Sequence, residues 1–400
     1  MKRNLQGETG IYRESGLQEV IVATGNFTEL GGSLMPEEVL EAMLDAARSF
    51  VDIRALHEWA GQVIVNVTGA EAGYVTSGAA AGLVLATAAC MTGSDPAAVQ
   101  QLPDCESLKN EVVIHKAHSS HYNRMFRLAG AKVKEVGYGT HRTLPWQLES
   151  ALDESTAAIV YLVSQILVSQ TALPLSEVLR IARAQGVPVI VDAANELPPV
   201  ENLRKFIEMG ADLVIFSGGK DLQGPQPSGF ICGRRDLIEA CALNGAPNHG
   251  IGRPMKVGKE EIVGLVAALK RYVRLDHQAR LARWEQRVSL IVDGLADVGQ
   301  LRVSRVFPDY TGRPVPRAWL TWDEEAAGLS RQEVLDALAK GSPVIRVMEE
   351  YAGKGLLIDP TTLLDGQEAI IAEVLRRIFA GRGSARPRRS VAPGVQEGKS

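Results

Sequence analysis

The segment GVPVIVDAANELPPVENLRKFIEMGADLVIFSGGK, residues 186–220, decides how this chain folds. Two apolar runs that contain β-branched residues, 187–191 and 213–216, enclose a segment with helical character. Two such runs joined by a helix predict a βαβ unit with parallel strands. The first run ends on Asp192, and the second leads through Ser-Gly-Gly to Lys220. Because open α/β sheets bind ligands outside the carboxyl ends of their strands, we expect Asp192 and Lys220 to face the same crevice.

An acid and a lysine at neighbouring strand ends suit the cofactor pyridoxal phosphate. This cofactor needs a lysine for its Schiff base and an acid against its pyridinium nitrogen. The alternative interpretation is an ordinary strand-end aspartate and a solvated lysine in a loop. The glycines around Lys220, together with a phosphate-loop candidate earlier in the chain, favour the cofactor.

The phosphate-loop candidate is Ser77-Gly78-Ala79, which lies between a short predicted strand, 74–76, and a helix of small residues that runs to Met91. The first amides of a helix have no partner within the helix, and the helix dipole favours an anion there. Small residues allow a phosphate to approach these amides and the Ser77 hydroxyl. A glycine-rich turn that only saves space is the alternative. The position of Ser77-Gly78-Ala79 after the first strand of the predicted domain favours a phosphate-binding loop.

Two residues are candidates for the faces of a flat pyridine ring. His118, in HKAHSSH (115–121), follows a predicted strand, and an imidazole there could stack on the ring and bind substrate. His121 is its local competitor, and an exposed histidine-rich loop is the alternative. Ala194, two residues after Asp192, is small enough to lie against the other face of the ring.

Three cations are candidates for binding anions of the cofactor or the substrate. Arg253 and Lys256 lie in the glycine-containing loop HGIGRPMK (249–256), and they could bind a phosphate, across a subunit boundary in one version of the hypothesis. Arg346 lies on a predicted strand near the C-terminus, and its rigid fork of donors matches a carboxylate. The alternative for each of these cations is an exposed residue without a binding role, because exposed arginines are common.

The order of the predicted elements gives an α/β fold with a seven-stranded, mostly parallel sheet and helices on both faces. The strand candidates are residues 74–76, 112–114, 133–136, 157–163, 187–191, 213–216 and 230–232. The expected domains are an N-terminal arm with helices (1–70), a large cofactor-binding domain (71–257), an interdomain helix with a small α+β domain (258–380) and a disordered tail (381–400). A charged amphipathic pattern over residues 259–298 predicts one long helix between the two domains.

The composition is that of an ordinary soluble protein, with 46% hydrophobic and 22% charged residues. The net charge of −4 gives no electrostatic reason to expect nucleic acid or an anionic membrane as a partner. Four cysteines without a CxxC or Cys/His cluster predict no metal site and a reducing, cytoplasmic setting. Residues 72–94 carry no charge, but their small side chains favour a buried helix over a membrane span.

The chain resembles the fold-type I pyridoxal-phosphate enzymes. Within them it is similar to the group around bacterial selenocysteine synthase (seryl-tRNA selenium transferase) and D-glucosaminate-6-phosphate ammonia-lyase, over roughly residues 20–380. The resemblance is carried by TGAEA (68–72), TSGAAA (76–81), VDAA (191–194), FSGGK (216–220), GPQ (224–226) and GRPMK (252–256).

The resemblance implies Lys220 as the Schiff-base lysine, Asp192 at the pyridine nitrogen and His118 near the ring. It implies four residues around the cofactor phosphate, namely Ser77, Gly78, Ala79 and Ser217. It implies that Arg253 belongs to a basic loop used around anions. Selenocysteine synthases carry an additional N-terminal domain for tRNA, for which this chain leaves no room, so we expect no nucleic-acid partner.

The function expected from these features is a lyase that eliminates water and ammonia from a 2-amino-3-hydroxy acid, with a phosphorylated amino sugar acid such as D-glucosaminate 6-phosphate as one candidate. The product is then a 2-keto-3-deoxy acid. A racemase or a β-replacement transferase would share every step up to loss of the Cα proton. A cofactor-binding regulator without turnover is the alternative of another class. The glycine-rich N-terminal arm predicts a homodimer or higher homo-oligomer, because such arms often cross a neighbouring subunit.

Overall fold

The computed structural model describes residues 10–163, 171–350 and 353–381. Contacts divide the chain into two units. The small unit comprises residues 1–24, 283–306 and 316–400, and the large unit comprises residues 25–282 and 307–315. This division does not test the domain boundaries expected after residues 70, 257 and 380, which stay a prediction. Apart from Gly381, the tail expected over residues 381–400 lies outside the described residues.

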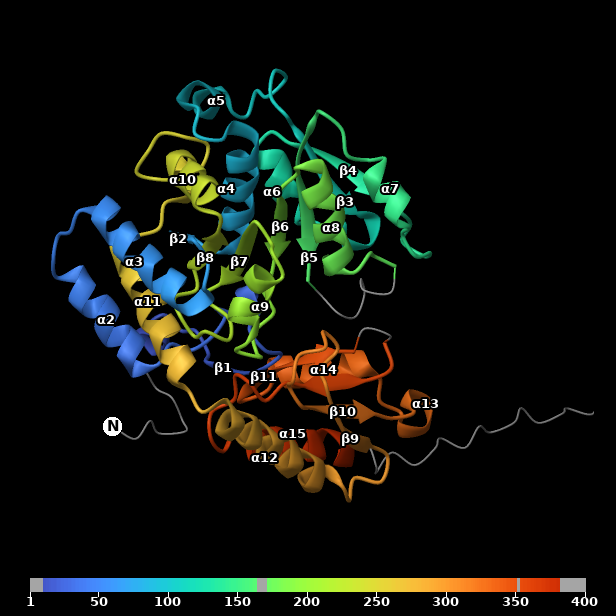
Figure 1. The fold of residues 1–400 in the computed structure, drawn as a ribbon. Coiled ribbons are helices and arrows are strands. Elements are labelled where there is room, and N and C mark those ends of the chain that lie inside the picture. The colour runs from blue at the N-terminus through green and yellow to red at the C-terminus, as the bar shows by residue number, and fades with distance from the viewer. Residues whose placement is uncertain (1–9, 164–170, 351–352, 382–400) are drawn as a thin grey trace, which may run out of the picture. The chain divides into compact units, whose positions relative to one another are not determined.

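The large unit is built on a seven-stranded sheet (Figure 1). Its strands, in spatial order, are β2 (Ala72–Thr76), β8 (Gly229–Gly233), β7 (Leu213–Ser217), β6 (Val189–Asp192), β5 (Thr156–Leu162), β3 (Glu111–His115) and β4 (Lys132–Val136). β8 is antiparallel to both of its neighbours, and the remaining pairs are parallel. The seven predicted strands and the largely parallel α/β sheet are therefore confirmed.

Helices cover both faces of this sheet. The helices of the large unit are η1 (Thr28–Leu30), α2 (Glu37–Ala47), α3 (Ile53–Thr68), α4 (Ala79–Thr92), α5 (Pro96–Gln101), η2 (Lys116–His118), α6 (Asn123–Leu128), α7 (Pro145–Glu149), α8 (Leu175–Gln185), α9 (Asn202–Glu208), α10 (Arg235–Asn244), η3 (Arg253–Met255) and α11 (Lys259–Arg274). In β6, Val189 and Val191 belong to one hydrophobic core and Ile190 to the other. A strand buried on both faces needs a continuous apolar run, which is why residues 187–191 could be recognised from the sequence.

The uncharged segment 72–94 forms β2 and α4, and α4 lies inside the large unit. Nearly every residue of α4 is buried, as expected for a helix that is apolar on all sides. None of the helices in the described ranges is long and apolar enough to cross a membrane.

The prediction of one long helix over residues 259–298 is wrong in one respect, because the structure has two helices there. α11 ends at Arg274, and α12 (His277–Leu295) begins after two residues. Leu275 is in an extended conformation, and the carboxylate of Asp276 accepts a hydrogen bond from the Ala279 amide at 2.9 Å. An aspartate that caps a new helix start ends the first helix locally, although the amphipathic period continues.

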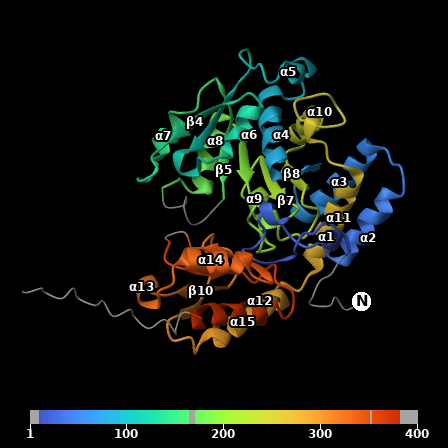
Figure 2. The same ribbon diagram turned by 180° about the vertical axis from the view of Figure 1, so that it is seen from behind.

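The small unit has a five-stranded sheet with helices, an α+β arrangement (Figure 2). In spatial order its strands are β1 (Val20–Ala23), β11 (Val344–Glu349), β12 (Leu356–Ile358), β10 (Arg317–Thr321) and β9 (Arg302–Val306). Its helices are α1 (Gly10–Glu14), most of α12, α13 (Glu324–Ala327), α14 (Arg331–Lys340) and α15 (Gln367–Ala380). β1 was not predicted, because a four-residue strand is defined only by its partner, and Val20 pairs with Val344.

Candidate active site

The predicted site loops of the large unit begin at one edge of its sheet. Gly229 of β8 pairs with Thr76 on one side and with Ser217 on the other. The loop that starts at Ser77 and the turn that starts at Ser217 therefore leave the sheet at the same level. A Cβ atom on Gly229 would lie 2.9 Å from the Ala79 nitrogen and 2.8 Å from the Phe216 oxygen, so only glycine allows this approach.

Lys220 lies in a tight turn directly after β7. The Gly218 amide donates to the Ser228 carbonyl at 2.8 Å, and the Gly224 amide donates to the Gly218 carbonyl at 2.9 Å. A Cβ atom on Gly219 would come within 2.6 Å of Oε1 of Gln226, so a larger residue would open the turn. Burial lowers the pKa of the Lys220 amine, and the nearby Asp192 carboxylate opposes this shift. The turn thus holds the lysine in a partly desolvated place beside an acid.

Asp192 is the last residue of β6 and is buried. Burial raises the pKa of its carboxyl group, while the Ala194 amide and the Lys220 charge act to lower it. The Ala194 amide donates to Oδ1 of Asp192 at 3.0 Å, so Ala194 fixes the orientation of the carboxylate. Asp192 and Lys220 are near enough for each charge to act on the pKa of the other, and their roles towards a cofactor stay a prediction.

His118 is buried at the end of η2, whereas His121 is exposed. The Leu162 amide donates to Nδ1 of His118 at 3.3 Å, and Leu162 pairs with Asp192 in the sheet. His118 therefore lies one strand away from the acid. Burial, and secondarily His115, lowers the pKa of His118 to about 3, so the ring is neutral at physiological pH. With Nδ1 as acceptor, Nε2 carries the proton, and this buried atom has no partner among the described residues.

The loop Ser77-Gly78-Ala79 joins β2 to α4. Gly78 has a φ of 115°, and no side chain caps the helix that follows. The Ser77 hydroxyl donates to the Met255 carbonyl at 2.9 Å, so this loop is attached to η3. Arg253 and Lys256 flank that carbonyl in the sequence, and both are exposed.

Arg346 is exposed on β11 of the small unit. It belongs to the small unit, whereas Lys220 belongs to the large unit. Ser217, the last residue of β7, is half-buried next to the Lys220 turn.

Sequence reasoning missed two charged residues near the Asp192–Lys220 pair. Glu196 is buried in the turn after β6. Arg313, from the segment 307–315, donates to the Leu197 carbonyl at 3.2 Å and is ion-paired with Asp309 at 2.8 Å. Glu196 could have been noticed as a polar position soon after Asp192, but no local pattern predicts the contact made by Arg313.

The N-terminal arm also contacts the lysine turn. The Ser33 hydroxyl donates to the Gly219 carbonyl at 3.2 Å. Gly32 has a φ of 74°, and a Cβ atom there would overlap the Gln226 side chain. The glycine-rich arm noted in the sequence therefore packs against the residues that position Lys220.

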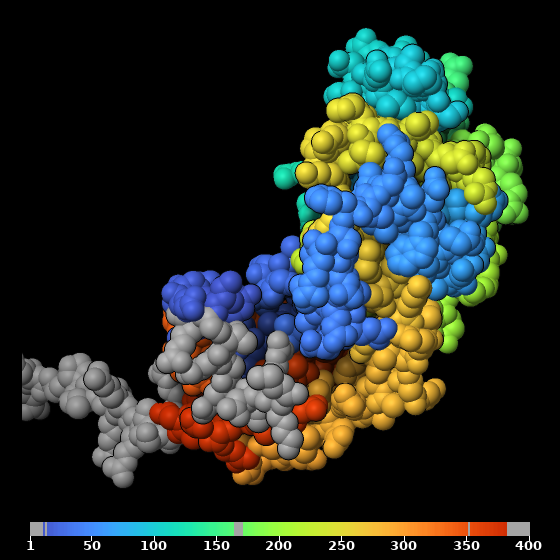
Figure 3. Space-filling model, turned by 90° about the vertical axis from the view of Figure 1, so that its left-hand side faces the viewer, coloured from blue at the N-terminus to red at the C-terminus, as the bar shows by residue number. Residues whose placement is uncertain are grey.

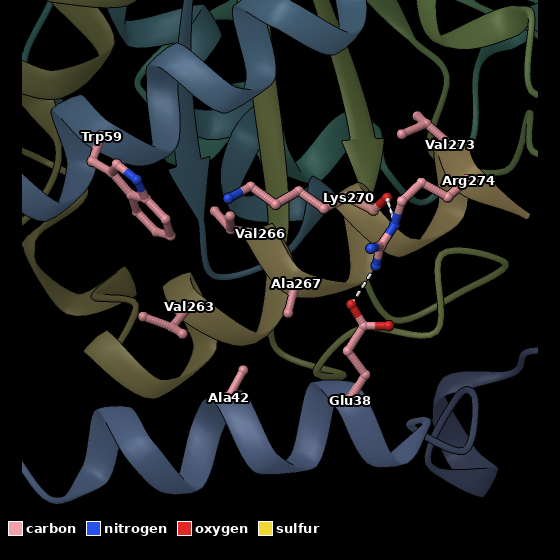
Figure 4. A pocket seen from close by; sticks show the side chains of 9 residues that line it. All are labelled: Glu38, Ala42, Trp59, Val263, Val266, Ala267, Lys270, Val273 and Arg274. Carbon is pink, nitrogen blue, oxygen red and sulfur yellow. Dashed lines mark hydrogen bonds and ion pairs between the residues drawn. The ribbon is translucent and has the colours of Figure 1, made fainter.

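A groove elsewhere on the large unit contains none of the predicted site residues (Figure 4). It is lined by Glu38, Ala42, Trp59, Val263, Val266, Ala267, Lys270, Val273 and Arg274. Glu38 and Ala42 of α2 face α11, and Lys270 lies 5.1 Å from the centre of the Trp59 ring. Its walls are largely aliphatic, so it is a surface between helices and not the cofactor crevice. The described ranges contain no cluster of three or more His, Cys, Asp or Glu residues that could hold a metal ion.

Comparison with known proteins places this chain in a family. The family profile described as L-seryl-tRNA selenium transferase matches residues 19–284. A 5'-C-glycyluridine monooxygenase-decarboxylase of Streptomyces sp is 38% identical over 391 residues, which cover 96% of this chain and 95% of the relative. A D-glucosaminate-6-phosphate ammonia lyase of Salmonella typhimurium strain 14028s is 38% identical over 373 residues, which cover 92% of this chain and 97% of the relative. A solved structure of D-glucosaminate-6-phosphate ammonia-lyase matches with a TM-score of 0.83 and 36% identity, over 94% of this chain and 100% of that chain.

Proposed function

Because this chain belongs to the L-seryl-tRNA selenium transferase family and has its fold-type I architecture, we propose that it is a pyridoxal-phosphate-dependent lyase. It eliminates water and ammonia from a 2-amino-3-hydroxy acid and yields a 2-keto-3-deoxy acid. The observation that carries the proposal is the buried Asp192 beside the Lys220 amine at the carboxyl edge of the sheet. The ammonia-lyase relative supports a phosphorylated amino sugar acid as the substrate.

The residues present fit the cofactor. The N-terminus of α4 has no side-chain cap, and no heavy atom lies within 4 Å of a Cβ built on Gly78, so a phosphate can approach the first amides there. Nε2 of His118 is a buried donor without a partner among the described residues. When bound, pyridoxal phosphate supplies an electron sink for the negative charge that develops at the substrate Cα.

Lys220 has two roles in this proposal. Its Nζ would hold the cofactor, and its amine would take the proton from the substrate Cα. The lowered pKa of Lys220 suits this second role, because a base must be deprotonated at the working pH.

Asp192 and His118 would hold the ring of the cofactor. The Asp192 carboxylate, which is oriented by the Ala194 amide, would keep a proton on the pyridine nitrogen. Ala194 and His118 would flank the ring, and the neutral imidazole of His118 would offer Nε2–H to the cofactor or the substrate as a donor.

The remaining candidates bind anions. The amides of Gly78 and Ala79, with Ser77 and Ser217, would hold the cofactor phosphate. Three cations would bind anions of the substrate: Arg253, Lys256 and Arg346. Arg253 and Lys256 are exposed beside the loop that Ser77 joins to η3, a position suited to a substrate phosphate or carboxylate.

The monooxygenase-decarboxylase relative favours a second candidate function, in which the substrate loses its carboxylate in a reaction with oxygen. The two candidates are separated by screening D- and L-2-amino-3-hydroxy acids, with and without phosphate, for ammonia and 2-keto acid while oxygen is measured. The lyase releases both products at the same rate with or without oxygen. Carbon dioxide release that consumes oxygen would replace the lyase by the second candidate. If no substrate gives either activity, a racemase, a β-replacement enzyme or a regulator is favoured.

The proposal includes a homo-oligomer in a cytoplasmic setting. The helices α2, α3 and α11 lie side by side, and Figure 3 faces the side where α2 and α3 adjoin α11. Large apolar side chains are exposed on and near these helices: Leu40, Leu44, Phe50, Val51, Trp59 and Val273. Such a concentration of apolar surface is typical of an interface. The four unpaired thiols support a reducing compartment.

A further inference from the structure

Glu196 is a buried carboxyl group that the mechanism above leaves without a role. Its side chain belongs to a residue that is 4% exposed, in the turn that follows β6. The Glu196 amide donates to the Ala193 carbonyl at 3.1 Å, so the turn returns towards the strand end that carries Asp192. Among the described residues, no hydrogen-bond donor reaches the Glu196 carboxyl oxygens.

The backbone around Glu196 is fixed on both sides. The buried Asn202 donates from Nδ2 to the Glu196 carbonyl at 2.6 Å. The Arg313 guanidinium donates to Oδ1 of Asn195 at 3.4 Å and to the Leu197 carbonyl at 3.2 Å. Arg313 is itself held by Asp309 through two bonds, at 2.8 and 3.1 Å. The backbone on both sides of Glu196 is therefore fixed, while its carboxyl group receives no hydrogen bond from the described residues.

The charges around Glu196 explain why it can hold a proton. The pKa of Glu196 is raised to about 7, chiefly by burial; among the nearby charges Arg313 and Lys220 act to lower it, and Asp192 and Asp309 act to raise it. These four are the charged groups that face it, from β6, from the Lys220 turn and from the segment 307–315. A carboxyl group protonated near neutral pH is suited to general acid catalysis.

We propose that Glu196 is the general acid that protonates the leaving hydroxyl of the substrate, an assignment that rests on the proposed lyase function. Hydroxide is a poor leaving group, so elimination of water needs an acid near the Cβ hydroxyl that gives it a proton as the bond breaks. Lys220 is the rival donor, because it has just received the Cα proton. Glu196 is the residue that enters the reaction already protonated.

The proton and electron balance of this step is complete. Lys220 removes the Cα proton, and the electrons of that bond form the Cα–Cβ double bond. The Cβ–O bond breaks with its electron pair on oxygen, which takes the Glu196 proton and leaves as water. Glu196 is then a carboxylate and Lys220 an ammonium, and transfer of the proton from Lys220 to Glu196 restores both. The net change is loss of one water molecule.

The test compares two leaving groups in Glu196→Gln, using serine and 3-chloroalanine of the enantiomer that the wild type accepts. Chloride leaves without a proton, so only the hydroxyl substrate needs the acid. The variant is expected to lower kcat for serine by about 10²–10⁴-fold and kcat for 3-chloroalanine by less than about tenfold. Exchange of the Cα hydrogen with deuterated water should persist. Glu196→Asp should restore part of the serine activity, and the matched control Glu201→Gln, an exposed residue nearby, should leave both rates unchanged.

A second readout needs no turnover. In infrared difference spectra of the apoprotein, the wild type should show a protonated carboxyl band that titrates near pH 7 and is missing in Glu196→Gln. Absence of this band overturns the inference, as does an equal rate loss for both substrates or no loss for either. A wild type that releases no keto acid from any hydroxy acid but eliminates chloride refutes the proposed lyase function. The infrared band then decides only whether the Glu196 carboxyl group is protonated near pH 7.

Discussion

Tyr272 of α11 donates a hydrogen bond of 2.7 Å from its hydroxyl to Oδ2 of Asp221, the residue that follows Lys220. Arg280 of α12 donates to the same carboxylate at 2.8 and 3.2 Å, and its guanidinium lies 5.4 Å from the centre of the Tyr272 ring. Asp221 is buried, so its charge needs these partners. The lysine turn is therefore attached to two helices that follow it in the chain.

We expect Tyr272→Phe to destabilise the protein, because it removes a hydrogen bond to a buried charge and keeps the ring. Bonds to charged groups contribute about 1.5–3 kcal/mol to stability. The measurement is the urea unfolding midpoint, with Tyr122→Phe as the matched control. Tyr122 is 47% exposed, so its variant should change stability by no more than about 0.5 kcal/mol. Equal midpoints for the two variants would show that the Tyr272 hydroxyl contributes nothing.

The wild-type protein incubated with pyridoxal phosphate is expected to turn yellow, and Lys220→Ala is expected to stay colourless after removal of free cofactor. The reason is that Lys220, among the described lysines, is the one that lies in the buried turn after β7, close enough to Asp192 for its charge to act on the lysine. Borohydride reduction followed by peptide mass spectrometry should place the adduct on Lys220. Lys270→Ala, which alters a lysine beside Trp59, is the control and should keep the colour. An uncoloured wild type would refute the cofactor assignment.

Light scattering is expected to show a dimer or a larger homo-oligomer, and charges introduced at Leu44 and Phe50 should dissociate it. Phe50 is fully exposed in the described chain, and Leu44 is 52% exposed on α2. The double variant Leu44→Glu/Phe50→Glu should shift the scattering mass towards that of one chain. Lys205→Glu, an exposed change on α9, should leave the mass unchanged. A wild type that is monomeric and fully active contradicts the proposed oligomer.

Arg346→Lys is expected to lower kcat/KM by about one to two orders of magnitude while the cofactor absorbance stays the same. Lysine keeps the charge but loses the two-pronged geometry that holds a carboxylate, and each charge-assisted bond contributes about 1.5–3 kcal/mol. Steady-state kinetics measure the effect, and Arg302→Lys, at an exposed position on β9, is the control. If Arg346→Lys is kinetically silent, the substrate carboxylate is held elsewhere, and Arg253 becomes the next candidate.

His57 is expected to make the protein less stable as the pH falls from 6.5 towards 4. Burial lowers the pKa of His57 from 6.5 to about 4, and its ring stacks on Tyr74 at 4.4 Å. The unfolded chain therefore binds a proton in this window that the folded chain does not, so this contribution is complete above pH 6.5 and is lost below it. By pH 5.5 the loss is about 1.4 kcal/mol. Urea unfolding of wild type and His57→Gln at pH 7.5 and 5.5 measures it, and equal pH dependence in both would contradict the assignment.

Much of the fold follows from local sequence. The apolar run 187–191, the strand 213–216 and the loop after residue 76 each have a pattern that specifies strand or helix within a few residues. Parallel strands place their carboxyl ends together, so the pairing of Asp192 with Lys220 could be predicted from the βαβ unit alone.

Other features are decided only by tertiary structure, because they depend on which distant segments pack together. Val20 becomes part of a strand only by pairing with Val344. Arg313 reaches the Leu197 carbonyl from a segment more than a hundred residues later, and nothing near Arg313 in the sequence indicates that contact. Burial raises the pKa of Glu196 and lowers that of His118, and the burial of a side chain is a property of the packed chain rather than of its neighbours in sequence.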